Sequence, residues 1–116
     1  MATQPIDPNS NVLFDGGTGT GNDTSFAFRS DNAKNDFNRL DIWLKDAVAI
    51  TAGSIKLQTL KPGVKIGEDV GTDWNNTQDV IVAPDEFNIS YLNGWCRLKL
   101  TGIDGTIEAI LRRNEN

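Results

Sequence analysis

Residues 95–113 read "WCRLKLTGIDGTIEAILRR", and two alternating runs within this stretch decide the fold class. Alternation of apolar and polar residues with a period of two predicts β-strands that bury one face. The "GIDG" between the two runs predicts a turn, and the "NG" at 93–94 predicts a hairpin with the run at 86–92. The positions predicted to face inward are Cys96, Leu98, Leu100, Ile107, Ala109 and Leu111.

The rest of the chain repeats this pattern of short apolar runs closed by turn residues. "SIKLQTL" at 54–60 places Ile55 and Leu57 on one face and is followed by the turn signal "KPG", and "DVIVA" at 79–83 is closed by a proline. Short strands without crossover helices predict an all-β protein, an antiparallel β-sandwich of jelly-roll-like form.

One segment fits two templates. Residues 37–50, "FNRLDIWLKDAVAI", place Leu40, Ile42 and Leu44 on one face of a strand, but their apolar residues also form a helical stripe that Asp36 would cap. We expect a strand, because the downstream sequence is strand-like, and leave a short helix near 36–48 as the alternative.

A chain of 116 residues is long enough for one domain with one core. We expect an N-terminal arm and first short strand at 1–14, a glycine-rich hinge at 15–24 and a β-sandwich domain at 25–116. The arm carries two prolines and few apolar residues. Its candidate partner-binding residues are Pro5, Ile6, Pro8 and Val12.

The hinge "DGGTGTGNDT" has the composition of a ligand-binding loop, and three known motifs bear comparison with it. A phosphate loop needs a lysine where Asn22 and Asp23 stand, and a dinucleotide loop needs a glycine in place of Asn22. Calcium is the remaining ligand, with oxygen from Asp15, Asn22 and Asp23, but the glycine-rich calcium repeats occur in several copies and this chain has one. A glycine link with positive φ angles is the favoured interpretation.

Composition disfavours most kinds of chemistry. The chain has no histidine and one cysteine, Cys96, which excludes histidine-dependent nucleophilic triads and the usual zinc sites. The acidic pairs Glu68–Asp69 and Asp85–Glu86 lie in polar loops and are predicted to be solvated. The net charge of −5 disfavours nucleic acid and anionic membranes as partners. We therefore expect no enzymatic activity and no cofactor or metal.

Three tryptophans are candidate exposed aromatic contacts. Trp43 and Trp95 fall on the outward face of their predicted strands, and Trp74 lies in a predicted loop. Exposed aromatic rings stack on sugars and are enriched at protein interfaces. A carbohydrate-binding or tail-fibre-type adhesion module is therefore the alternative function.

Residues 52–111 resemble small β-sandwich virion proteins of tailed bacteriophages. The resemblance is carried by "AGSIKLQTLKPG", then "GTDWNNTQ", then "VAPDEFNISYLNGWCRLKLTGIDGTIEAIL". It implies a capsid decoration, or cement, protein that binds the major capsid protein and its own copies as a homotrimer. Such a protein is made in the host cytoplasm and ends on the outer capsid surface of the virion. It works by contact and stabilises the shell because it binds only the assembled form.

Overall fold

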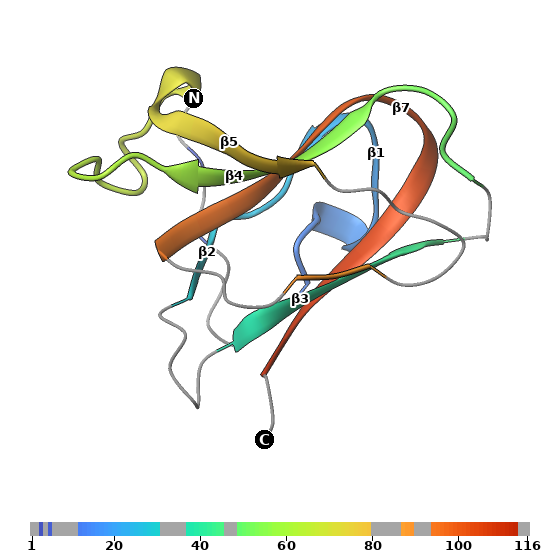
Figure 1. Cartoon of the computed structure of the whole chain (residues 1–116), viewed down its shortest axis with the longest axis horizontal. Coiled ribbons are helices and arrows are strands. Elements are labelled where there is room, and N and C mark those ends of the chain that lie inside the picture. Colours follow the sequence, from blue (N-terminus) through green and yellow to red (C-terminus); the bar gives the residue numbers. More distant parts are fainter. Residues whose placement is uncertain are drawn as a thin grey trace.

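The structure is a computed structural model of the chain, and its described residues are 3, 5, 12–30, 37–45, 49–79, 87–89 and 94–113. They form a mostly antiparallel β fold, which confirms the predicted all-β class (Figure 1). The strands are β1 (Gly19–Thr24), β2 (Phe28–Ser30), β3 (Phe37–Leu44), β4 (Ser54–Leu60), β5 (Trp74–Asp79), β6 (Phe87–Ile89) and β7 (Gly94–Arg113). Two short 3-10 turns are η1 (Asp15–Gly17) and η2 (Gly71–Asp73).

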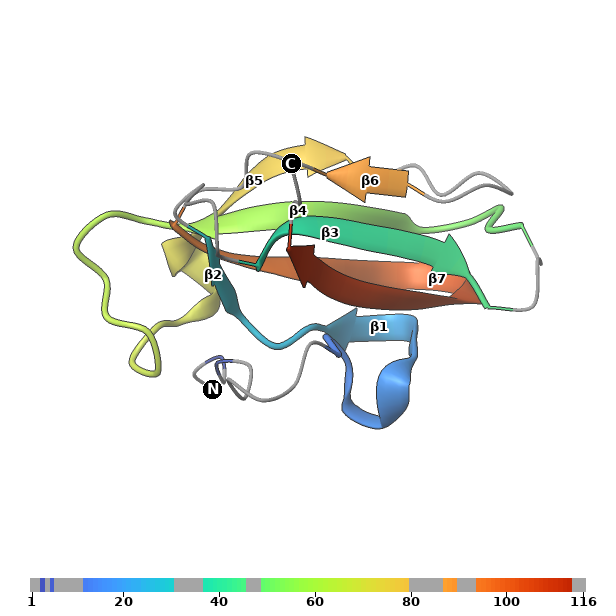
Figure 2. The same ribbon diagram turned by 90° about the horizontal axis from the view of Figure 1, so that it is seen from below.

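One long strand organises the whole sheet. β7 is 20 residues long and is the long curved ribbon in Figure 1. The strand order is β5-β4-β7-β3-β6, and β1 and β2 also pair with β7. In Figure 2, β3 and β4 lie on one side of β7, and β1 lies on the other. Both flanking sets run antiparallel to β7, so this strand holds segments from distant parts of the sequence together.

The predicted turn at "GIDG" is wrong, because β7 continues through it. The buried apolar residues of β7 are spaced by two from Cys96 to Leu100 and again from Ile103 to Leu111, so one extra residue separates the two halves. Gly102 in this interval has a φ angle of +60°, and the pairing with β1 shifts register here. An inserted residue of this kind is a β-bulge that bends the strand. The bulge keeps both halves of β7 directed at the same core.

The core is the apolar face that the alternation predicts. The cluster consists of Leu13, Phe14, Phe28, Leu40, Ile42, Leu44, Ile55, Leu57, Cys96, Leu98, Leu100, Ile103, Ile107, Ala109 and Leu111. Every inward position predicted in β3, β4 and β7 is a member. Cys96 is buried among these residues as a small apolar side chain.

Of two further expectations about the strands, the one for residues 37–44 is confirmed and the one for the hairpin is corrected. Residues 37–44 are strand β3, so the alternative of a helix does not hold there, while 36 and 46–48 lie outside the described residues. β6 pairs with β3 rather than with β7, so the described strands on either side of the "NG" do not form the predicted hairpin. In the register of this pairing, Leu40 lies opposite Ile89 and Ile42 opposite Phe87.

Candidate functional site

A group of buried polar residues lies on the face of the sheet opposite the core. Its members, which we call the Arg97 cluster, are Thr3, Gln58, Asp69, Trp74 and Arg97. Gln58 on β4 is directly opposite Arg97 on β7, and both are outward positions of their strands. Each member is at most 8% exposed, although four of the five are polar or charged residues. Such residues are buried when hydrogen bonds replace the water that they lose.

Arg97 is held by partners on three sides. Its Nε donates to Gln58 Oε1 at 2.7 Å, and Nη1 donates to the hydroxyl of Thr3. The guanidinium carbon lies 4.3 Å from the centroid of the Trp74 ring, within the range of a cation–π contact. Burial lowers the pKa of Arg97, and the negative charge of Asp69 acts in the opposite direction. The guanidinium is therefore a fixed, charged centre of the cluster.

Asp69 completes the cluster as an acceptor of several hydrogen bonds. Trp74 Nε1 donates to Asp69 Oδ2 at 2.8 Å, and the backbone N–H of Thr3 donates to both carboxylate oxygens at 3.2 Å. Gly67 N–H also donates to Oδ1 at 3.2 Å. Burial alone raises the pKa of Asp69, but the hydrogen bonds from Trp74 and Thr3 outweigh it and lower the pKa to about 2. The carboxylate is thus ionised beside Arg97 at neutral pH.

The local sequence explains how Asp69 reaches this position. The loop between β4 and β5 turns at Pro62 and Gly63, and the backbone N–H of Lys61 donates to the carbonyl of Asp73 to close it. Turn η2 then brings the chain directly into Trp74, the first residue of β5. The loop therefore folds Asp69 back over the strand that follows it. The prediction that Asp69 is solvated is wrong, whereas Glu68 beside it is exposed.

The N-terminal residues that the structure describes dock on their own domain. Thr3 lies in the Arg97 cluster, and Pro5 forms a parallel bridge with Ala27. Val12 bridges Ile110 of β7, and Leu13 belongs to the core. The described residues of the expected arm at 1–14 thus pack on the domain itself, and the apolar side chain of Leu13 is buried by it. Of the candidate partner contacts, Pro5 is exposed, Val12 is half-buried, and Ile6 and Pro8 lie outside the described residues.

The glycine-rich stretch at 15–24 is structured rather than a hinge. Gly19–Thr24 is strand β1, which pairs with β7, and Phe14, just before the stretch, packs so closely that a Cβ on Gly19 would lie 2.9 Å from its ring. Two of the oxygen atoms considered for calcium are engaged by the backbone. Asn22 Oδ1 accepts from Gly102 N–H at 2.7 Å, and Asp23 Oδ1 accepts from Thr24 N–H at 2.8 Å. The glycines allow β1 to lie close to the core, and they allow the turn that precedes it.

The tryptophans divide into two kinds. Trp74 is 6% exposed, which contradicts its assignment as an exposed contact, because its ring packs on Arg97 and its indole N–H is bonded to Asp69. Trp43 and Trp95 are half-buried. Trp95 lies on β7 opposite Arg29 of β2, whose side chain is exposed.

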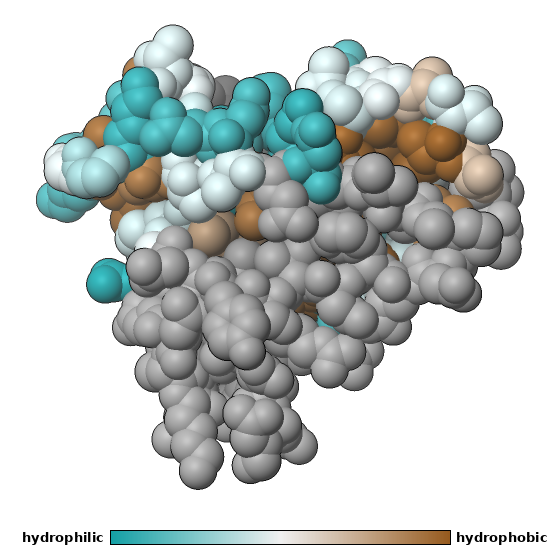
Figure 3. All heavy atoms as spheres, in the orientation of Figure 1, coloured by the Kyte–Doolittle hydropathy of each residue, from teal (hydrophilic) through white to brown (hydrophobic). Residues whose placement is uncertain are grey.

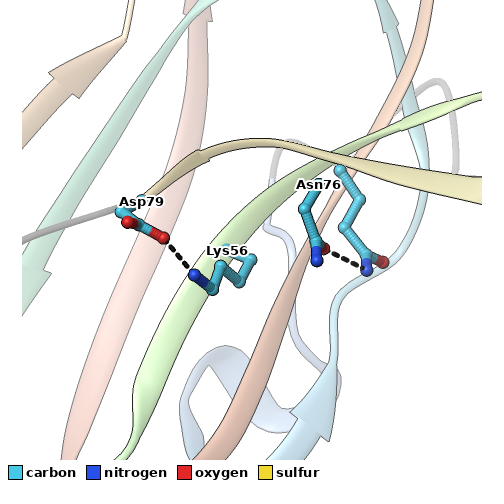
Figure 4. Close-up of polar contacts among 4 residues, drawn as sticks. Lys56, Asn76 and Asp79 are labelled. Atoms are coloured by element: carbon cyan, nitrogen blue, oxygen red, sulfur yellow. Dashed lines mark hydrogen bonds and ion pairs between the residues drawn. The ribbon is translucent and has the colours of Figure 1, made fainter.

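From Gln58 of the Arg97 cluster, polar pairs continue along the outward face of β4 and β5 (Figure 4). Gln58 Nε2 donates to Asn76 Oδ1 at 3.0 Å, and Lys56 forms an ion pair with Asp79. Both pairs join residues that lie opposite each other across the two strands. Figure 3 shows hydrophilic residues gathered along the upper part of the molecule, where β4 and β5 lie in Figure 1.

The sequence patterns do not reveal the Arg97 cluster as a unit. Alternation places Arg97 on the outward face of its strand, which is correct, but its partners at 3, 58, 69 and 74 are far away in sequence. The one local signal is the combination of an aspartate and a tryptophan at the two ends of a short turn, 69–74.

Neither a metal cluster nor a membrane-spanning helix was found among the described residues. No group of three or more His, Cys, Asp or Glu residues in the described ranges could hold a metal ion. Within the same ranges, no helix has the length and apolar character that crossing a membrane requires.

Comparisons with known proteins assign no relative to this chain. No protein-family model, no curated protein and no solved structure matches it.

Proposed function

We propose that this chain is a non-enzymatic structural protein of a tailed-bacteriophage virion, a decoration or cement protein of the capsid. In this proposal it binds the outer capsid surface, contacts the major capsid protein and its own copies as a homotrimer, and bridges neighbouring coat subunits. The resemblance over 52–111 and the all-β fold support this role.

The observation that carries the proposal is the anchoring of the N-terminal arm at both ends. Thr3 is fixed by Asp69 and Arg97, and Val12 is fixed by its bridge to Ile110. An arm that starts and ends on the domain loses less conformational freedom when it meets a partner than a free tail would. Pro5 is held by its bridge to Ala27 and is still exposed, so it is available for such a contact.

The stabilising effect would follow from binding linkage. A ligand that binds only the assembled shell shifts the equilibrium toward that shell by mass action. Many copies, each with contacts to coat subunits and to its neighbours, add avidity without a strong single interface. The polar pairs of β4 and β5 suit contacts of this kind, which are individually weak.

The test is co-sedimentation of the purified chain with coat-protein shells from the same source. We expect the full chain to sediment with expanded shells, and a variant lacking residues 1–11 to lose most of this binding while keeping its β-sheet circular dichroism. A matched control is Thr72→Ala, an exposed position in η2, which should bind as the parent does. A full chain that stays in the supernatant refutes the decoration role, and equal binding by the truncated chain refutes the role of the arm.

A carbohydrate-binding module is the second candidate, and the half-buried Trp95 beside the exposed Arg29 is the observation that favours it. The burial of Trp74 removes one of the three aromatic contacts on which this alternative depended. If it is correct, tryptophan fluorescence should shift with an oligosaccharide from a glycan panel, and Trp95→Ala should abolish the shift. A flat titration across the panel would count against it.

A further inference from the structure

A hollow opens on the sheet where β1 pairs with β7, next to the bulge at Gly102. Thr101 and Gly102 of β7 together stand opposite Asn22, so the ladder between the two strands is interrupted there. The hollow has a volume of about 540 Å³, within the range of about 300–1,000 Å³ that is typical of small-ligand sites. Its lining residues are Asn22, Asp23, Thr24, Lys99, Leu100 and Thr101.

Two of the polar lining side chains are held in place by backbone groups of the same strands. Asn22 Oδ1 accepts from Gly102 N–H at 2.7 Å. Asp23 Oδ1 accepts from Thr24 N–H at 2.8 Å. Within the described part of the chain, these bonds leave the amide nitrogen of Asn22 and the second carboxylate oxygen of Asp23 for a ligand. Side chains that are fixed before a ligand arrives lose less conformational entropy when it binds.

The hollow carries one side chain of each charge. Asp23 and Lys99 both line it and both are exposed, and among the described residues neither forms an ion pair. A small anion such as phosphate is repelled by Asp23, and a metal cation is repelled by Lys99. An apolar ligand gains little here, because Leu100, the one apolar lining residue, is only 2% exposed.

A ligand with several hydroxyl groups suits this set of side chains. Each hydroxyl both donates and accepts, so one can donate to the carboxylate of Asp23 while another accepts from the ammonium of Lys99. Thr24 and Thr101 add two hydroxyls of the protein, which take either role. A compact ring with adjacent hydroxyl groups, as in a monosaccharide, meets these requirements.

We propose that the hollow between β1 and β7 binds a saccharide unit, with Asp23 as acceptor and Lys99 as donor. The site differs from the carbohydrate-binding candidate above, because Trp95, four residues before Lys99 on β7, does not line the hollow. It is also independent of the decoration role. The binding is weak, because the site is open and each hydrogen bond to the sugar replaces one to water.

The test is titration of the isotope-labelled full chain with glucose, galactose, mannose and N-acetylglucosamine, followed by NMR up to about 100 mM, well above a millimolar Kd. We expect at least one sugar to give saturable shifts of the backbone N–H resonances at 22–24 and 99–101. Lys99→Met and Asp23→Asn should each weaken this binding at least about tenfold. The matched control is Lys56→Met, which should bind as the parent does, since Lys56 lies opposite Lys99 on β4 and outside the hollow.

Two results would overturn the proposal. The first is the absence of saturable shifts at these resonances with all four sugars, and parallel titrations with sodium phosphate and calcium chloride would then show whether the hollow binds an ion instead. The second is sugar binding that survives Lys99→Met and Asp23→Asn but is lost in Trp95→Ala. That result would place the sugar at Trp95 and favour the carbohydrate-binding candidate above. Neither measurement needs shells, so failure here is distinguishable from failure of the decoration role.

Discussion

The indole Nε1–H of Trp74 donates a hydrogen bond of 2.8 Å to Oδ2 of Asp69, five residues earlier in the chain. This bond fixes the end of the 61–73 loop against the first residue of β5. The same ring covers Arg97, so one tryptophan joins the loop to the central strand β7. Together with Thr3, these contacts tie the N-terminus, the loop and the sheet into one unit.

Trp74→Phe should destabilise the protein by about 1–3 kcal/mol, because it removes a hydrogen bond to a buried carboxylate while keeping an aromatic ring. Urea unfolding followed by circular dichroism would measure the change. The control is Trp95→Phe, which alters a half-buried ring and should cost less than about 1 kcal/mol. Equal losses in the two variants would mean that the bond to Asp69 contributes nothing measurable.

Arg97→Met should cost about 3 kcal/mol or more, because it leaves the buried Asp69 without its neighbouring positive charge. The matched control is Lys99→Met, which changes the next outward position of the same strand. Lys99 is exposed, so its loss should change the free energy of unfolding by about 0.5 kcal/mol or less. Similar losses of unfolding free energy in the two variants would show that the buried Arg97 stabilises the protein no more than the exposed Lys99 does.

The stability should fall in acid through Asp69. Its pKa is about 2 in the folded chain against an ordinary value of 3.8, so the folded state binds fewer protons in this window than the unfolded state. The stabilisation is complete above the ordinary pKa and is lost as the pH falls toward 2. Asp69→Asn should remove about 1–2 kcal/mol of the pH dependence of unfolding between about pH 4 and pH 2.

Asp104 provides the control for this titration. A hydrogen bond from the Thr51 hydroxyl, with another from its backbone, lowers the pKa of Asp104, but this carboxylate is exposed. Asp104→Asn should therefore reduce the pH dependence of the unfolding free energy in acid less than Asp69→Asn does, because solvent screens an exposed charge. The reverse order would show that Asp69 is not the main acid-sensitive group of the pair.

The sequence predicts the inward face of β3, β4 and β7 well because that face depends only on local alternation. Leu40, Leu57 and Leu98 lie in the core as the period of two requires. The pairing of strands is not predicted in this way, because alternation alone does not determine whether β6 pairs with β3 or with β7. The choice depends on long-range contacts that a local pattern does not encode.

The Arg97 cluster could not be predicted from the sequence either, because it too depends on contacts between residues far apart in the chain. Arg97 occupies an outward position, and outward charged residues are normally solvated. Its burial comes from a loop and an N-terminal residue that cover it, and nothing in "WCRLKLT" indicates such a cover. The bulge at Gly102 likewise resembles a turn in sequence, because glycine with a positive φ angle serves both structures.

Gly53→Ala should be among the most damaging substitutions of a surface residue. Gly53 has a φ angle of +82°, and a Cβ there would overlap the carbonyl oxygen of Thr101 and lie 2.5 Å from the carbonyl carbon of Gly102. We expect a loss of about 3 kcal/mol or more. Gly63→Ala is the matched control, since its φ angle is +86° and no atom beyond its two chain neighbours lies within 4 Å of the added Cβ, and it should cost about 1–2 kcal/mol. Equal losses would mean that backbone strain alone, without the steric overlap, accounts for the effect.

The ion pair of Lys56 and Asp79 should contribute little, in contrast to the buried charges of the Arg97 cluster. It joins β4 to β5 on the outward face, where the side chains are 35% and 70% exposed (Figure 4). Exposed pairs are screened by solvent and salt, so a double-mutant cycle with Lys56→Met and Asp79→Asn should give a coupling of less than about 1 kcal/mol. The coupling should shrink further in about 1 M salt, where the screening length falls to about 3 Å. A coupling that is larger, or insensitive to salt, would indicate that this pair is shielded from solvent, and the β4–β5 face would then be a covered surface rather than an open one.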